Sequence, residues 1–229
     1  TPQRNKQPHN KQAAMYRRRE RTNVEFPEFK GIQINMMPIV MLDPESIPKE
    51  YHGYLPLLNF VPRNGEIGYL SIWESEVPAG ESQRRPGLHV ERSPDPVLLL
   101  DGNRGRGEAG RWGGVIGGLY QGSNVSDTCQ VWDYECDSPG PYGDCEFLRD
   151  SLEHGVLMKA GEIWWMTDTC VHESLPVKET VRRQWFRVVT EDLDVWYSQH
   201  STPNPLGIVP PDLVVIADHD KFQLTKAAQ

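Results

Sequence analysis

His89 and Glu91 are the two residues whose types and spacing most directly suggest chemistry, because a single residue, Val90, separates them. On a β-strand, side chains two positions apart leave the same face, so this imidazole and this carboxylate would converge on one point. Val90 would then face the opposite way, into packing that suits a β-branched apolar side chain. The pair supplies two of the three protein ligands that an open metal site needs.

The third ligand has to come from another strand, and His172 is the best donor. It follows a strand-like segment, residues 161–166, and it precedes another strand. Two histidines and one carboxylate on one face of an iron leave three positions open for cosubstrate and dioxygen. We therefore predict a metal site made of His89, Glu91 and His172.

Two alternatives compete with this metal site. His200 is the strongest rival for the third ligand, although the strand residues before it provide a poorer context. A zinc site is the other alternative, built from Cys129, Cys136 and Cys145 in a stretch rich in Gly and Pro. Together with Cys170 these cysteines have neither CxxC spacing nor the density of a disulfide scaffold, so we expect reduced thiols.

The sequence around His172 carries more information than the histidine alone. Residues 172–177 read HESLPV, Arg182 follows ten residues after His172, and the turn Ala160-Gly161-Glu162 precedes the histidine. In these motifs the chain resembles the Fe(II)/2-oxoglutarate dioxygenase superfamily, particularly its prolyl-hydroxylase-like branch. The resemblance covers about residues 67–190.

This resemblance implies roles for individual residues. His89, Glu91 and His172 would bind Fe(II), and Arg182 would bind the distal carboxylate of 2-oxoglutarate. A guanidinium suits that task, because it offers two parallel N–H donors and stays charged when enclosed. Strand alternation puts Gln184 on the face of Arg182, where it could add a hydrogen bond to the cosubstrate. Arg183 and Arg187 would share the opposite face, and a register shift of one residue would give the role of Arg182 to Arg183.

The implied function is that of a non-haem dioxygenase, an oxidoreductase that uses 2-oxoglutarate and O2 to oxidise a C–H bond. The substrate would be a small molecule or an amino-acid-like compound. Glu91 stands where the family more commonly carries aspartate, and its carboxylate favours hydroxylation, desaturation or ring closure over halogen transfer. Two other functions stay open: a cupin-like metal enzyme that does not use 2-oxoglutarate, and a catalytically silent binding scaffold.

The sequence predicts that short strands position these residues. Nineteen Pro and twenty Gly interrupt helices and supply turns. We predict a mainly β fold, a double-stranded β-helix (jelly roll, cupin-like) with a few flanking helices. A single domain would span residues 31–229, after a basic arm, residues 1–30, that could become helical over residues 10–20. The predicted strands are residues 31–42, 67–77, 97–100, 115–120, 129–134, 163–166, 184–190 and 195–197, and short helical segments are predicted at 44–51 and 148–154.

Net charge and hydropathy limit the classes of binding partner that we expect. The net charge of −8 argues against nucleic acid or an anionic membrane, since both require a cationic face. No run approaches the ~18 apolar residues of a membrane span, and the amino terminus lacks an apolar signal core, so we expect a cytoplasmic protein. Arg84 and Arg85 lead directly into the metal strand, where one of them could reach a carboxylate or phosphate of the substrate.

Overall fold

The chain is mainly β, with antiparallel sheets and few short helices. The computed structural model describes residues 16–18 (backbone only), 23–41, 43–61, 65–91, 118–190, 193 and 195–222. The longest helices in these ranges have six residues, so none of them approaches the ~20 apolar residues that span a bilayer.

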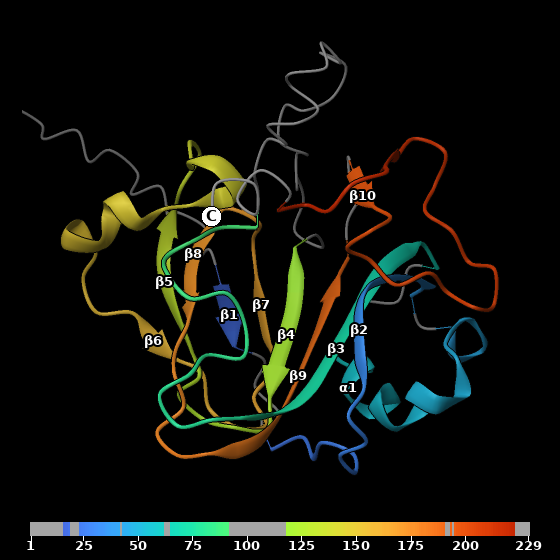
Figure 1. Cartoon of the computed structure of the whole chain (residues 1–229), viewed down its shortest axis with the longest axis horizontal. Coiled ribbons are helices and arrows are strands. Elements are labelled where there is room, and N and C mark those ends of the chain that lie inside the picture. The colour runs from blue at the N-terminus through green and yellow to red at the C-terminus, as the bar shows by residue number, and fades with distance from the viewer. Residues whose placement is uncertain are drawn as a thin grey trace, which may run out of the picture.

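A six-stranded antiparallel sheet forms the larger part of the fold (Figure 1). Its strand order is β1-β7-β4-β9-β3-β2, so strands distant in sequence are neighbours in space. The bounds are β1 Tyr16–Arg18, β2 Gln33–Val40, β3 Ile67–Val77, β4 Leu119–Ser123, β7 Trp164–Met166 and β9 Val181–Val189. The longest pairing joins β3 to β9, with Tyr69 opposite Val189 and Val77 opposite Val181.

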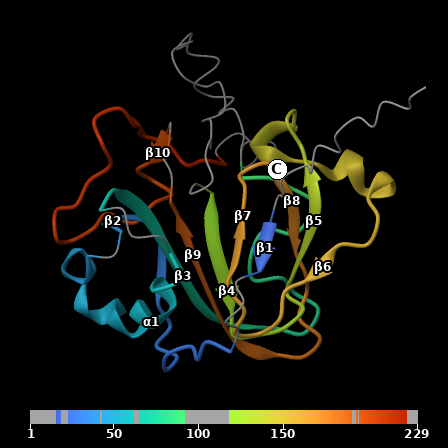
Figure 2. The ribbon, with the colours of Figure 1, turned by 180° about the vertical axis from the view of Figure 1, so that it is seen from behind.

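A second, three-stranded sheet has the order β6-β5-β8 and lies beside the first, as Figures 1 and 2 show from opposite sides. Its strands are β5 Cys129–Glu135, β6 Val156–Leu157 and β8 Cys170–Ser174. A parallel pair, β10 Val195–Tyr197 and β11 Val215–Ala217, completes the strands described. The helical segments are η1 Pro44–Ser46, η2 Lys49–Tyr54, α1 Leu55–Leu58, η3 Pro141–Gly143 and η4 Glu146–Ser151.

The two faces of the larger sheet pack against different partners. Its outer face packs against η2 and α1, in a cluster that includes Ile72, Phe186 and Leu57. Its inner face packs toward the smaller sheet, in a cluster that joins Tyr69 and Val189 to residues of β5 and β8. Alternation along β9 therefore sends even-numbered residues such as Phe186 outward and odd-numbered residues such as Val189 inward.

Most predicted strands match observed ones. The strands predicted at residues 67–77 and 195–197 have those bounds, and those at 31–42, 129–134, 163–166 and 184–190 differ from β2, β5, β7 and β9 by a few residues. The strand at 97–100 lies outside the described residues, as does the first half of the one at 115–120, and β4 begins at Leu119. The predicted helical segments correspond to η1 with the start of η2, and to η4.

The amino-terminal segment departs from the prediction. Tyr16–Arg18 form strand β1, paired antiparallel with β7, instead of the helical turn expected there. Val24 and Phe26 also pack against the outer core cluster. The chain therefore contacts the folded body before residue 31, since Phe26 packs edge-on against Tyr54 of η2 and Phe186 of β9.

Candidate metal centre

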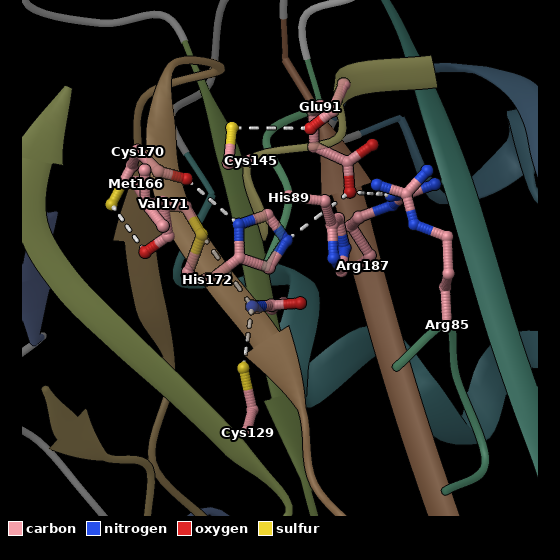
Figure 3. Close-up of polar contacts among 12 residues, drawn as sticks. Arg85, His89, Glu91, Cys129, Cys145, Met166, Cys170, Val171, His172 and Arg187 are labelled. Atoms are coloured by element: carbon pink, nitrogen blue, oxygen red, sulfur yellow. Dashed lines mark hydrogen bonds and ion pairs between the residues drawn. The ribbon is translucent and has the colours of Figure 1, made fainter. Parts of the chain in front are cut away.

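His89 and His172 are brought together by backbone pairing between two distant segments. The N–H of His89 donates to the carbonyl of His172 at 2.9 Å, and the N–H of His172 donates back at 3.0 Å. Residues paired in this way project their side chains to the same side of the sheet. The two imidazole rings accordingly lie with centroids 4.4 Å apart, and Glu91 joins them two residues beyond His89 (Figure 3).

The three side chains have the geometry of a metal-binding group. Their candidate ligand atoms all lie within 4.8 Å of one another, and His172 Nε2 is 3.8 Å from Glu91 Oε1. Ligand atoms bound ~2.1 Å from one metal ion are roughly 3–4 Å apart, so small side-chain movements would complete coordination. The predicted group of His89, Glu91 and His172 could therefore bind a metal ion.

The hydrogen bonds of both histidines leave the correct nitrogen available for a metal. His89 Nδ1 is 2.7 Å from the Gly87 carbonyl, and His172 Nδ1 is 3.0 Å from the Cys170 carbonyl. A carbonyl can only accept, so each Nδ1 carries a proton, and in the neutral imidazole this tautomer leaves the Nε2 lone pair for a metal. Burial, together with the neighbouring His172 and the Arg85 guanidinium, also holds the pKa of His89 well below its usual value. His89 is therefore a neutral, ligand-competent imidazole at neutral pH.

Glu91 is kept ionised by Arg187. Burial alone would raise the pKa of Glu91, but the charge of the Arg187 guanidinium outweighs it and holds this pKa well below 4.5. Arg187 Nη1 donates to Glu91 Oε1 at 2.6 Å, and Figure 3 shows Arg187 and Arg85 beside the carboxylate. The sequence did not identify Arg187 as a partner of the triad, although alternation along β9 put it on the face of Arg183.

Arg182 and Gln184 do not lie with the triad. Arg182 is exposed, and its Cζ lies 5.4 Å from the centre of the Phe29 ring. Gln184 is buried on the outer face of the larger sheet, where its Nε2 donates to Glu74 Oε1 at 2.9 Å and lies 3.2 Å from the hydroxyl of Tyr54. We expected Arg182 and Gln184 to face the cosubstrate beside the metal. The structure corrects this, since both side chains leave β9 on the face opposite Arg187.

Arg183 takes the inward position that the alternative register assigned to it. Its side chain is 1% exposed, with Nε bonded to the hydroxyls of Ser123 and Thr128 and Nη1 bonded to Gln83 Oε1. No carboxylate pairs with it within the described residues, and burial lowers its pKa to about 10. Arg183 is thus a buried cation whose remaining N–H groups on Nη1 and Nη2 are available to an anion.

The two rival metal sites do not assemble in the described part of the chain. His200 Nδ1 instead faces Asp220 Oδ2 at 3.9 Å. Cys136 and Cys145 belong to one apolar cluster while Cys129 packs against another, and all four cysteines, Cys170 included, are free thiols. The expectation of reduced thiols is confirmed, and the Cys129–Cys136–Cys145 group is not among the metal-competent clusters in these ranges.

No protein-family model and no curated protein matches this sequence. The chemistry of the site is therefore inferred from the geometry of its own side chains.

Proposed function

We propose that this protein is a non-haem Fe(II) oxygenase that uses 2-oxoglutarate and O2 to oxidise a C–H bond. The substrate would be a small molecule or an amino-acid-like compound. The observation that supports this most directly is the group of His89, Glu91 and His172, with each Nδ1 bonded to a backbone carbonyl and the carboxylate ionised. This donor set suits Fe(II), and it leaves coordination positions open.

A double-stranded β-helix is the fold that we propose for this site. The larger antiparallel sheet faces a smaller one, and residues from both share an apolar cluster between them. The triad sits at the junction, because His89 pairs with β8 of the smaller sheet while Glu91 contacts Arg187 on β9 of the larger one. Such an arrangement gives the metal two rigid walls, which a catalytic site needs for precise positioning.

Fe(II) at this position would supply the redox chemistry that activates dioxygen. The residues of the chain would bind and orient the reactants around it. The backbone carbonyls of Gly87 and Cys170 fix the tautomers of the two histidines, and Arg187 keeps Glu91 deprotonated. These contacts support a ligand set that is ready before the metal arrives.

We assign the distal carboxylate of 2-oxoglutarate to Arg183 in place of Arg182. Arg183 faces inward, lacks an acidic partner in the described ranges, and is held by Ser123, Thr128 and Gln83. A guanidinium fixed in this way can offer two parallel N–H donors to a carboxylate without losing further side-chain freedom. Arg182 is exposed on the opposite face and has no such position.

Anaerobic calorimetry with Fe(II) and then 2-oxoglutarate tests this proposal. We expect His172→Ala to lose Fe(II) binding, and Arg183→Met to bind Fe(II) normally but 2-oxoglutarate about 10- to 100-fold more weakly. Arg182→Met is the matched control and should bind both like the wild type. Unchanged 2-oxoglutarate binding in Arg183→Met would instead favour a cupin-like metal enzyme, and absence of Fe(II) binding in the wild type would favour a scaffold.

A further inference from the structure

Arg84 occupies a position between two tryptophans on the inner face of the larger sheet. Its Cζ lies 4.4 Å from the ring centre of Trp185 and 5.3 Å from that of Trp73. These tryptophans are direct cross-strand partners on β9 and β3. The Cζ of Arg187 lies 5.3 Å from the same Trp185 ring, so two guanidinium groups gather at one indole.

Arg84 and Arg187 have one acidic neighbour between them, Glu91, among the described residues. Arg187 uses Nη1 for Glu91 and Nη2 for the sulfur of Met36, while its Nε is buried without a partner. Arg84 has no hydrogen bond or ion pair in these ranges; its guanidinium lies over the two indoles and is attracted by Glu91 at longer range. Arg85 is occupied elsewhere, because its Nη1 donates to the Tyr142 carbonyl at 2.7 Å.

An unpaired cation and an unpaired N–H in a partly enclosed site both carry a free-energy cost. Burial and repulsion from Arg187 lower the pKa of Arg84 to about 10, because the site holds more positive than negative charge. Indole faces stabilise a guanidinium through its plane and leave its N–H edge open. An anion at that edge would pair with Arg84 and could also accept from Arg187 Nε.

We propose that Arg84 and the Nε of Arg187 form a subsite for a carboxylate of the primary substrate. This inference rests on the proposed function and narrows it, because it makes the substrate an organic acid. The subsite differs from the position assigned to 2-oxoglutarate in using Arg187 Nε, since Arg183 and Arg187 are four residues apart on β9, or ~13 Å along a strand, while Arg84 lies over Trp185 between them. The planar guanidinium of Arg84 can offer two parallel N–H donors, which match the two oxygens of a carboxylate.

Paired probes of different size test the charge requirement. The probes are acetate, benzoate and indole-3-acetate, each compared with its amide, titrated anaerobically into protein loaded with Fe(II) and 2-oxoglutarate. We expect at least one acid to bind about 10-fold or more tightly than its amide. We expect Arg84→Gln to remove that preference, Arg84→Lys to retain part of it, and the exposed-face control Arg182→Gln to leave it unchanged.

Several outcomes would overturn the subsite. They are equal binding of acids and amides by the wild type, an undiminished preference for the acid in Arg84→Gln, and competition of the bound acid with 2-oxoglutarate. If Arg84→Gln does not fold, as judged by circular dichroism, Arg84→Lys decides the matter by whether its preference falls. Failure of the proposed function is distinguishable, because it appears as absent 2-oxoglutarate binding in the wild type, whatever the acids do.

Discussion

Glu74 is expected to be a main determinant of stability on the outer face of the larger sheet. Its side chain is 1% exposed, and its two oxygens accept four hydrogen bonds. Oε1 accepts from the Tyr54 hydroxyl at 2.7 Å and from Gln184 Nε2 at 2.9 Å. Oε2 accepts from the backbone N–H groups of Lys30 at 2.6 Å and Ile32 at 3.0 Å. Removing this carboxylate would take this acceptor from all four donors, of which Gln184 Nε2 alone keeps another, the Pro27 carbonyl at 2.9 Å.

The size of the effect follows from these four donors. A buried donor left unpaired costs about 1–3 kcal/mol, and partial hydration of the two backbone groups reduces the sum, so we expect Glu74→Leu to lose about 3–6 kcal/mol. Glu74→Gln keeps one acceptor oxygen and should lose about 1–3 kcal/mol. Both losses are large compared with the 5–15 kcal/mol that stabilises a typical domain.

Equilibrium urea denaturation followed by tryptophan fluorescence measures these changes. Glu76→Leu is the matched control, because Glu76 is exposed on the same face of β3, two residues farther on, and its replacement should change stability by less than about 0.5 kcal/mol. Fe(II) affinity should not change in Glu74→Gln, since Glu74 points away from the triad. A Glu74→Leu protein as stable as the Glu76→Leu protein would refute the reasoning.

The pH dependence gives a second check on Glu74. Burial alone would raise its pKa, but the hydrogen bonds from Ile32, Tyr54, Gln184 and Lys30 together hold the pKa below its usual value of 4.5. A carboxyl group with a depressed folded-state pKa stabilises the protein fully above its unfolded-state pKa, and this stabilisation disappears as the pH falls through the folded-state value. The stability difference between wild type and Glu74→Gln should therefore be constant near neutral pH and shrink below about pH 4.5.

Three further predictions concern the triad, the sheet and the thiols. His89→Ala should lose Fe(II) binding in anaerobic calorimetry while His200→Ala keeps it, and the reverse result would make His200 a ligand. Gly122→Ala should lower the free energy of unfolding by about 1–3 kcal/mol in thermal melts, because a Cβ there would lie 2.8 Å from the Glu162 carbonyl oxygen. Gly140→Ala, whose nearest contact would be an ordinary 3.4 Å, is its control, and equal melting temperatures would contradict the packing argument. Burial raises the pKa of Cys129 to about 12 and raises those of Cys145 and Cys170, so a thiol reagent at pH 8 should modify these three only after unfolding. Rapid modification of all three in the native protein would show that they are not enclosed.

Local sequence pattern predicted the group of His89, Glu91 and His172 that could bind a metal ion. The convergence of His89 and Glu91 was predicted from a two-residue strand period, although in the structure His89 forms only isolated β-bridges and residues 89–91 belong to no strand. The strand at residues 67–77 was equally readable, because a run of β-branched and aromatic residues lies between turn-forming residues. These features depend on neighbours in the chain, and the sequence contains them directly.

Contacts between distant segments could not be read in this way. Arg84 meets Trp185, and Glu91 meets Arg187, only because the segment before His89 folds across β3 and β9. The separation of Cys129 from Cys136 and Cys145 likewise follows from packing into different clusters. Nothing in the local spacing of these residues encodes which of them become neighbours.

The orientation of β9 shows most clearly what the sequence determines and what only the tertiary structure decides. Alternation by itself established that Arg182 and Gln184 share one face and that Arg183 and Arg187 share the other. It did not establish which face looks toward the metal, because β9 is buried on both sides from Arg183 to Val189 and shows no polar and apolar alternation. Only the packing of helix α1 against one face and of the smaller sheet toward the other decided that Arg183 and Arg187 point inward.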